Sequence, residues 1–457
     1  MSTTSTAAEA AVPAKVQEGI NARRLFILSC LCLATTSFSF ILRGSIASDL
    51  KAELFDPIDA AHSASMLGSA LGWAFPGFAF MVLIGSAVVD FLGMRNLLLL
   101  CGANFIVGPL LVVGADKIAP GNAGTIVAIG MFLNGLGWGC SETVINPLTT
   151  AIYPKDKTHR LNVLHAWWPA GIIIGGLLAI GASAMKIGWR VEFGLLLLPA
   201  VAILGMAAGT KFPKTERVAA GVSSSEMYKQ ALRPGFLLFL GAMFLTASSE
   251  LAPGQWVDMA LSRTVGMRGT LLLVYVAGLM FVMRHFAGAM VKRLSSIGLL
   301  WCSCLLAAIG LVALSKANSP VTGFLAATIW GVGVCYMWPT MLATAAERFP
   351  KGGAFVMGLI GSAGAAAIQF VLPKMGSIFD QAKTDAVAQG MSADKVEAAG
   401  SDAAYAALTG PAKDHVDALA SAASFRFVAM LPAVLLVVFG AVWLNDRRKG
   451  GFKPEQI

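Results

Sequence analysis

The sequence predicts an all-α integral membrane protein in which twelve transmembrane helices form two six-helix halves. Three observations lead to this fold class: a very apolar composition, a series of long apolar runs, and a short pattern that recurs between the halves. Of the 457 residues, 56% are hydrophobic and only 13% are charged, whereas about a quarter of the residues of a soluble protein are charged. This composition excludes a soluble multidomain enzyme and a disordered chain. Long runs without strand-like alternation favour helices over a lipid-facing barrel.

Twelve apolar runs reach the length of about 20 residues that a helix needs to cross the hydrocarbon core. In chain order, the predicted spans are 25–46, 64–88, 97–115, 123–151, 161–184, 191–210, 235–257, 270–291, 297–315, 321–345, 355–376 and 426–445. The first run follows a polar tail that ends in Arg23 and Arg24, and it is too long for a cleaved signal peptide. We therefore interpret it as the first transmembrane helix.

Polar stretches between these runs predict the domain organisation. We expect a cytoplasmic tail at 1–24, a first six-helix half at 25–210, a cytoplasmic linker at 211–234, a second half at 235–445 and a cytoplasmic tail at 446–457. Within the second half, residues 380–424 are rich in Ala, Asp, Lys and Gly, which predicts an extracytoplasmic segment of short amphipathic helices. Two motifs recur at the same offset: Gly-Leu-Gly at 135–137 as Gly-Val-Gly at 331–333, and Tyr-Pro-Lys at 153–155 as Phe-Pro-Lys at 349–351. This agreement indicates an internal duplication.

The basic residues predict how the chain crosses the membrane. Lys and Arg gather in the two tails, in the linker and in alternate loops, which places both termini in the cytoplasm. The net charge of +9 is then a topology signal, and nucleic-acid binding is unnecessary to explain it. We expect a multi-pass protein of the plasma membrane or a bacterial inner membrane, with lipid as its surroundings and a monomeric state. The seven cysteines all fall inside predicted spans without metal-ligand spacing, so we expect no disulfide, metal or cofactor.

The predicted fourth helix carries polar and aromatic residues at every fourth position: Asn134, Trp138, Glu142 and Asn146, followed by Pro147. Residues at this spacing share one face of a helix. A carboxylate at this depth must face the bundle interior or a water-filled cavity, because exposure to lipid is costly. We interpret Glu142 as the leading functional residue. The alternative is a structural carboxylate bonded to a neighbouring helix.

The predicted fifth helix opens with Asn162, His165, Trp167 and Trp168. An amide, an imidazole and flat indole faces suit a polyhydroxylated ligand, whose hydroxyls take hydrogen bonds and whose ring C–H faces take apolar contact. The alternative is an interfacial tryptophan belt with a helix-packing histidine, because Arg160 lies close by. Candidates in the second half are Glu250, Gln255, Trp256, Arg284, His285, Tyr336, Trp338, Thr340 and Gln369.

A loop after the second predicted helix resembles a motif of the major facilitator superfamily, Gly-x-x-x-Asp-x-x-Gly-x-Arg. It contains Asp90, Gly93 and Arg95, with Ser86 in place of the first glycine. The resemblance implies a charge latch that steadies one conformation and does not touch substrate. The second-half copy at 288–293 has a lysine at the position of the acid, which predicts a weaker latch.

Within that superfamily, three motifs resemble the fucose–galactose–glucose proton symporters. They lie at 139–147 (an acid followed by Asn-Pro), 160–165 (Arg-Leu-Asn, then His) and 336–340 (Tyr-x-Trp-Pro-Thr). The resemblance matches Glu142 to the family's coupling glutamate, His165 to a sugar-contacting glutamine and Trp168 to an asparagine. The family's helix-one aspartate has no counterpart, because the first helix has Thr and Ser residues followed by Arg43.

From these features we expect a secondary active transporter that works by alternating access and couples uptake of a monosaccharide or sugar derivative to a proton. The expected substrate-binding residues are Asn134, Trp138, Asn146, Asn162, His165, Trp168, Glu250, Gln255, Trp256, Trp338 and Gln369. Glu142 and Arg43 are the expected proton-coupling residues. One alternative is an organic-anion or sugar-acid transporter with Arg43 as counter-ion, and another is a membrane receptor that does not transport. An exporter stays open as well. No nucleophile, base and acid occur together, so we expect no enzyme.

Overall fold

The computed structural model describes residues 19–59, 62–261, 265–267, 269–390, 405 and 408–452. The described residues form helices, which confirms the all-α fold class. In chain order these are α1 (Ala22–Ser45), α2 (Ala47–Leu50), the π-helix η1 (Lys51–Phe55), α3 (Asp56–Asp59), α4 (Ser63–Gly72), α5 (Ala74–Leu92), α6 (Met94–Val113), α7 (Ala115–Ile118), α8 (Ala123–Ile152), α9 (Lys157–His165), α10 (Trp167–Ala184), α11 (Trp189–Gly194), α12 (Leu197–Ala208), α13 (Glu216–Ala219), α14 (Ser224–Gln230), α15 (Pro234–Leu261), α16 (Gly269–Arg284), α17 (Ala287–Leu314), α18 (Pro320–Val334), α19 (Met337–Arg348), the 3₁₀ helix η2 (Pro350–Gly352), α20 (Gly353–Gly390) and α23 (Gly410–Arg448).

Eleven helical segments of the described chain are long and apolar enough to cross a membrane. The shorter apolar helix Leu271–Arg284 takes the place of the predicted eighth span. That span was expected to run without interruption over 270–291, but α16 ends at Arg284 and a new helix begins at Ala287. In the same way, α9 and α10 share one span with a break after His165, and α18 and α19 share another with a break after Val334. The interrupted helices turn out to position the site.

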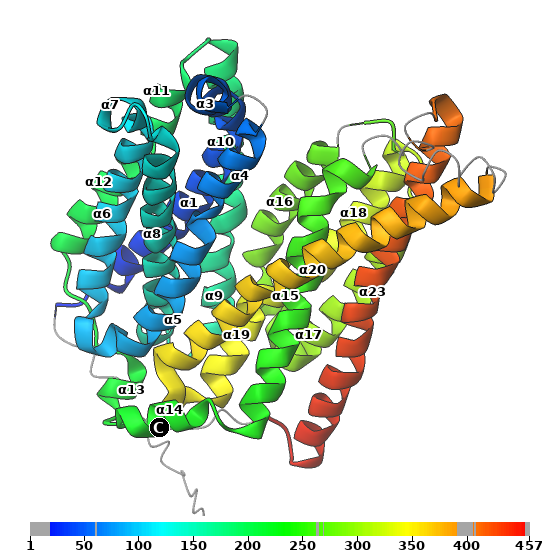
Figure 1. Ribbon diagram of the computed structural model, residues 1–457. Helices are drawn as coiled ribbons and strands as arrows, with labels where there is room; N and C mark the ends of the chain where they lie inside the picture. Colours follow the sequence, from blue (N-terminus) through cyan, green and yellow to red (C-terminus); the bar gives the residue numbers. More distant parts are fainter. Residues whose placement is uncertain are drawn as a thin grey trace, which may run out of the picture.

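The helices gather in two groups (Figure 1). We call α1 to α12 the first half and α15 to α23 the second half. Helices α13 and α14 lie below both groups, at the end of the molecule that also carries the C-terminus (Figure 1). Gly19, just before α1, lies against Lys211 at the start of the connecting segment (3.5 Å to the hypothetical Cβ). We refer to this end of the molecule as the terminal end.

Close helix packing within the first half depends on small residues. A Cβ added to Gly135 on α8 would collide with the carbonyl of Ala74 on α5, and one added to Gly171 on α10 would collide with Ser37 on α1. Glycine lets helix backbones approach each other closely, which favours packing in a membrane where burial from water supplies no drive. The contact at Gly135 holds α8, which carries Glu142, closely against α5.

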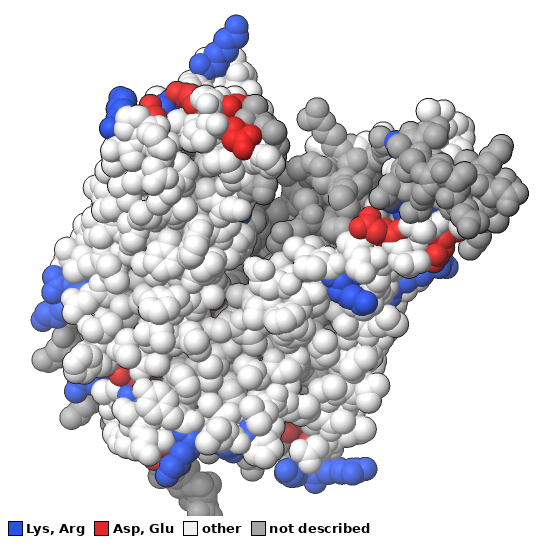
Figure 2. Space-filling model, viewed as in Figure 1, with Lys and Arg blue, Asp and Glu red and all other residues white. Residues whose placement is uncertain are grey.

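The two halves touch at the terminal end. The Thr158 hydroxyl on α9 donates to Glu347 on α19 (2.7 Å), and the backbone N–H of Gly288 on α17 donates to the His159 ring on α9 (3.1 Å). Ser86 on α5 packs so closely on Gly358 of α20 that a Cβ there would collide with it. At the opposite end the surface is hollowed between the halves (Figure 2). Charged side chains gather toward both ends and leave a broad uncharged band between them (Figure 2).

The last two long helices differ from the expectation. Residues 380–424 were predicted to form short amphipathic helices, but α20 continues to Gly390 and α23 begins at Gly410. At a rise of about 1.5 Å per residue, the 38 residues of α20 span roughly 57 Å, almost twice the hydrocarbon thickness. The reason is the alanine-rich stretch after Asp380, whose high helix propensity lets α20 continue outside the apolar core. Val387 and Val416 pack together where the two helices extend.

Candidate functional site

Glu142 lies on α8 at the boundary between the halves, with its side chain half-buried. The Asn146 amide, one turn further along α8, donates to Glu142 Oε1 (3.0 Å). The carbonyl oxygen of that amide accepts from Nε2 of His165 on α9 (2.9 Å), so this geometry sets the tautomer with the proton on Nε2. We call Glu142, Asn146 and His165 the polar line. Trp338 of α19 approaches the Glu142 carboxylate from the second half.

Arg284 continues this network into the second half. Its guanidinium donates to the carbonyl of His165 (2.7 Å), to the carbonyl of Cys335 (2.7 Å) and to the carboxylate of Glu250 (3.1 Å). The Arg284 side chain is only 2% exposed and that of Glu250 only 11%. A guanidinium offers five N–H donors in a fixed fork, which is why one side chain can serve several acceptors. The site thus reaches from Glu142 on α8 to Glu250 on α15.

Two further contacts cross between the halves at this level. The amide of buried Asn162 on α9 donates to the hydroxyl of Thr340 on α19 (3.3 Å). The Trp167 ring on α10 meets Phe281 on α16 edge-on, with 6.2 Å between ring centroids. The predicted residues Asn162 and His165 are therefore brought to the boundary, while both carry hydrogen bonds inside the protein.

The other end of the α8 stripe faces α1. The Ser39 hydroxyl lies between the Asn134 amide (2.8 Å from Nδ2) and the Trp138 indole N–H (3.2 Å). Trp138 is buried, and Phe40 and Phe75 flank its ring at 6.1 and 6.2 Å. Asn134 and Trp138 are therefore joined to α1 through a serine that the sequence alone did not single out.

Arg43 lies among these aromatic rings. Its guanidinium carbon is 5.1 Å from the Phe40 ring centroid, 4.9 Å from Phe75 and 5.5 Å from Trp138. One of its N–H groups donates to the carbonyl of Leu71 at the end of α4 (3.2 Å). Among the residues that the structure describes, no carboxylate lies within ion-pair distance of Arg43. The geometry gives a half-buried cation held by ring faces and unpaired with Glu142.

The remaining predicted residues lie apart from the network. Trp168 is half-buried, with its ring 6.1 Å from that of Phe40. Gln369 on α20 is exposed and does not join the network. The side chains of Gln255 and Trp256 lie outside the described residues. His285 is exposed, and its Nδ1–H donates locally to the carbonyl of Phe281 (2.7 Å). None of these positions is tested as a binding residue, so they stay predictions.

The residues of the predicted latch find partners elsewhere in the chain. Asp90 pairs with Arg217 of the connecting segment (2.5 Å) and accepts from the Thr215 hydroxyl (2.5 Å). Arg95 instead donates to the carbonyl of Ala208 (2.7 Å). Gly93 has φ 82° at the joint between α5 and α6, a conformation that favours glycine. Arg217 was missed at the sequence level because it lies on α13, a four-residue helix too short to show a periodic signal.

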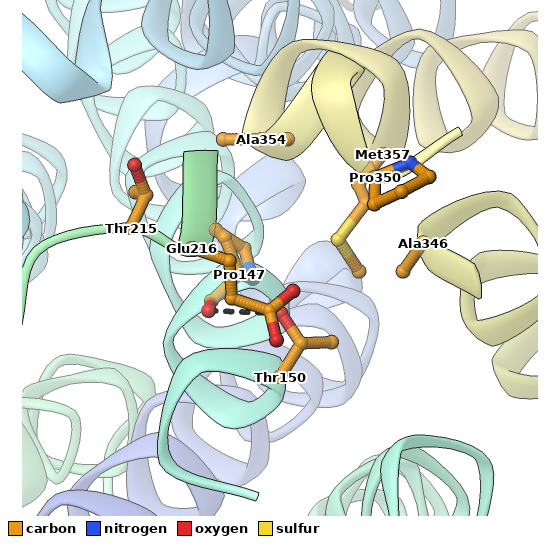
Figure 3. Close-up of a pocket in the computed structure, with 9 residues that line it drawn as sticks. Pro147, Thr150, Thr215, Glu216, Ala346, Pro350, Ala354 and Met357 are labelled. Carbon is orange, nitrogen blue, oxygen red and sulfur yellow. Dashed lines mark hydrogen bonds between the residues drawn. The ribbon is translucent and has the colours of Figure 1, made fainter. Parts of the chain in front are cut away.

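Next to this latch, Glu216 lines a small pocket at the terminal end (Figure 3). The pocket has a volume of about 10 Å³, room for about one water, and lies between Pro147 of α8, Ala346 of α19 and Met357 of α20. Glu216 pairs with Lys157 (2.8 Å), and burial raises its pKa against the lowering effect of that lysine. This pocket therefore leaves little room between α8, α19 and α20 at the terminal end.

The curated relatives match only part of this chain. Myo-inositol transporter 1 of Saccharomyces cerevisiae is 27% identical over 161 residues, which make up 34% of this chain and 24% of that protein. The chain thus aligns with about a quarter of the length of the curated relatives that it matches.

Two solved structures share the fold over most of their length. The fucose:proton symporter FucP of E. coli has a TM-score of 0.63 at 16% identity, covering 89% of this chain and 98% of that one. The proton:xylose symporter XylE, also from E. coli, has a TM-score of 0.67 at 13% identity, covering 92% and 95%. The Major Facilitator Superfamily model matches residues 24–371. On these grounds the chain belongs to the major facilitator superfamily.

Proposed function

We propose that this protein takes up a monosaccharide or a close polyhydroxylated derivative together with a proton, by alternating access between its two halves. The observation that carries this proposal is the half-buried Glu142 carboxylate, which accepts a hydrogen bond from Asn146 (3.0 Å) and lies at the boundary between the halves. An ionisable residue inside a membrane protein is a functional candidate by default, because its burial is costly.

Glu142 is suited to carry the coupling proton because no cation neutralises it. Its described neighbours, Asn146 and Trp338, are uncharged. An ionised carboxylate opposes movement of the loaded carrier through a low-dielectric barrier, and protonation removes that charge. One proton that moves inward across 100 mV supplies about 2.3 kcal/mol, which sustains roughly fifty-fold accumulation of a neutral substrate.

The substrate class follows from indole and amide side chains of α8, α9, α10 and α19, of which Trp338 lies next to Glu142. Indole rings at Trp138, Trp168 and Trp338, with the amide of Asn162, offer apolar faces and hydrogen-bonding groups. This combination suits a sugar ring, whose C–H faces pack on aromatic rings and whose hydroxyls need directional partners. The names of the relatives, which are inositol, fucose and xylose transporters, support the same class.

We assign the terminal end to the cytoplasm, so the hollow between the halves faces outward (Figure 2). The six-plus-six organisation with a linker at 211–234, the monomeric state, and residence in a plasma membrane or bacterial inner membrane belong to the same proposal. The basic residues of the connecting segment and both tails support this orientation.

The decisive experiment compares Glu142→Gln with the wild-type protein in proteoliposomes. An imposed inside-alkaline pH gradient should drive accumulation by the wild type and should no longer drive it in the variant, while exchange of labelled for unlabelled sugar persists. The control is Asp414→Asn, which removes an exposed carboxylate on α23 outside the network. Acid-driven uptake by Glu142→Gln equal to that of the wild type contradicts the proposal. Sugar binding by the wild type without flux would instead support a receptor.

A second candidate function is transport of organic anions or sugar acids, and one observation favours it. Arg43 is held by three aromatic rings and has no carboxylate partner among the described residues. A half-buried guanidinium with free donors suits a carboxylate ligand. In this case uptake of a uronate should exceed that of the neutral sugar, Arg43→Gln should abolish it, and Arg43→Lys should retain part of it. Equal uptake of both substrates by Arg43→Gln rules this function out.

A further inference from the structure

We propose that Arg284 is a positioning residue that ties the two halves together at the carbonyl of His165, and that this tie responds to the protonation of Glu142. The inference rests on the proposed function, because it names a link between the coupling carboxylate and closure of the terminal end. The tie is the hydrogen bond from the Arg284 side chain to the backbone carbonyl of His165. This carbonyl has no helical N–H donor, because the residue four positions later is Pro169.

Two of the three acceptors of Arg284 are carbonyls of this kind. In an α-helix the N–H of each residue donates to the carbonyl four residues earlier, and proline has no N–H. Pro169 therefore leaves the carbonyl of His165 free, and Pro339 leaves that of Cys335 free. Both carbonyls lie at helix breaks, next to Ala166 and Tyr336. Arg284 donates to each of them at 2.7 Å.

A third proline shows that such carbonyls recruit side chains elsewhere in this protein. Pro253 on α15 frees the carbonyl of Ser249, and the indole N–H of Trp330 on α18 donates to it (3.1 Å). The bonds to Ser249 and Cys335 stay within the second half. Of these three bonds, the one between Arg284 and His165 crosses from one half to the other.

Charge pairing keeps Arg284 in the second half. Its guanidinium and the Glu250 carboxylate form a buried pair (3.1 Å), and separating such a pair is strongly unfavourable because it leaves an uncompensated charge. Glu250 and Cys335 therefore hold the guanidinium on α16 when the halves separate. The bond to His165 is then the one that breaks as the terminal end opens, since its acceptor belongs to α9.

His165 also connects this bond to Glu142. Its ring donates to Asn146, whose amide donates to Glu142. When the carboxylate gains a proton, it becomes a weaker acceptor, because hydrogen bonds to ionised groups are roughly twice as strong as those between neutral groups. The Asn146 amide keeps its bond to the backbone carbonyl of Glu142 (3.1 Å) but is held less firmly by the side chain, so it orients His165 less strictly. The α9–α10 break that carries the His165 carbonyl can then shift away from Arg284. Proton uptake in this way favours opening at the terminal end.

The test uses spin-label distances across the terminal end, with labels at exposed Lys155 in the first half and exposed Arg293 in the second, in full-length protein in proteoliposomes. Pro169→Ala returns an N–H donor to the His165 carbonyl, so it should raise the ratio of open to closed molecules roughly tenfold at neutral pH. Pro339→Ala and Pro253→Ala are the matched controls, because they restore donors to carbonyls whose side-chain bonds stay within one half. These two variants should leave the ratio at the wild-type value.

Arg284→Lys is the second variant, because an ammonium keeps the charge near Glu250 but cannot reach three acceptors in a fork. It should shift the ratio in the same direction as Pro169→Ala. An unchanged ratio in Pro169→Ala, or an equal shift in Pro339→Ala, overturns the tie.

The variant Glu142→Gln tests whether the tie depends on the protonation of Glu142, because glutamine mimics the neutral carboxyl group. It should raise the open fraction at neutral pH toward that of Pro169→Ala, and further acidification should not add to it. A wild-type ratio in Glu142→Gln overturns the link. This readout is a distance at fixed pH, so it is independent of the uptake assay that decides the proposed function.

Discussion

Glu142 and Glu250 are two carboxylates in the interior of the same molecule, one in each half, and their surroundings differ in charge. Glu250 lies 3.1 Å from the Arg284 guanidinium and is almost fully buried. Glu142 is half-buried and has an amide and an indole as described neighbours. Protonation of a carboxylate beside a buried cation breaks an ion pair, whereas protonation of one beside neutral donors does not. The contrast teaches that burial alone does not distinguish the two carboxylates, and that a neighbouring cation does; under the proposed function, the carboxylate without a cation is the one that carries the proton.

The largest effect should come from breaking the pair in the second half. Glu250→Gln leaves the Arg284 charge buried without compensation, which should lower the free energy of unfolding by about 3–5 kcal/mol. Glu142→Gln removes no ion pair and should change it by less than about 1 kcal/mol. Thermal unfolding in detergent measures both.

The double variant Glu250→Gln with Arg284→Met is the control for this comparison. Because it removes both charges, it should recover most of the lost stability. Equal melting temperatures of Glu250→Gln and Glu142→Gln would mean that the ion pair of Glu250 contributes no more to stability than the unpaired Glu142. That result would contradict the predicted difference between the two carboxylates.

An intermediate effect is expected at Asp90, which has an arginine partner but lies at the terminal end. Asp90→Asn weakens its pairing with Arg217 (2.5 Å) and should cost about 2 kcal/mol. Arg95→Gln is the matched control, because this exposed arginine should contribute less than about 0.5 kcal/mol. If Arg95→Gln lowers the melting temperature more than Asp90→Asn does, Arg95 contributes more to the stability of the terminal end than the pair of Asp90 and Arg217, and this prediction is wrong.

A smaller effect than that of Asp90→Asn should come from Asn146→Ala, which removes the amide that donates to Glu142 (3.0 Å) and accepts from His165 (2.9 Å). We expect a loss of about 1 kcal/mol in stability together with a weaker dependence of transport on pH, since Glu142 and His165 are then no longer connected. Uptake measured across a series of external pH values gives the readout. A wild-type pH profile would exclude Asn146 from the polar line.

The fold class was predictable from composition, and α8 from its polar spacing. The spacing of Glu142 and Asn146 along α8 also placed them on one face, because helical periodicity is a local property. The partners of these residues were less accessible. Phe75, which flanks Arg43, comes from α5, and Arg217, which pairs with Asp90, comes from the connecting segment. Such contacts depend on how distant helices pack, and no spacing within one helix encodes them.

Two features of the sequence point to details that the structure shows. Each proline within a span marks a free carbonyl four residues earlier, so Pro169 and Pro339 pointed to His165 and Cys335 as acceptors. The alanine-rich stretch after Asp380 likewise signalled that α20 continues past the apolar core. The exposed position of Gln369 on α20, by contrast, could not be inferred, because the rotation of a long helix is set by its neighbours.

The contact between Ser86 and Gly358 fixes how α5 and α20 are aligned where the two halves meet at the terminal end. The motif of the superfamily has a glycine at the position of Ser86. In this chain the glycine of the contact is Gly358, on the facing helix α20. The Ser86 side chain on α5 fits into the space that Gly358 leaves on α20. The two helices can therefore pack fully at only one axial alignment. They must move apart before one can slide along the other. The exchange Ser86→Gly with Gly358→Ser would preserve the close packing of α5 and α20 with the side chain on the other helix. Gly358→Ser alone would place two side chains in the same space and prevent the helices from packing closely.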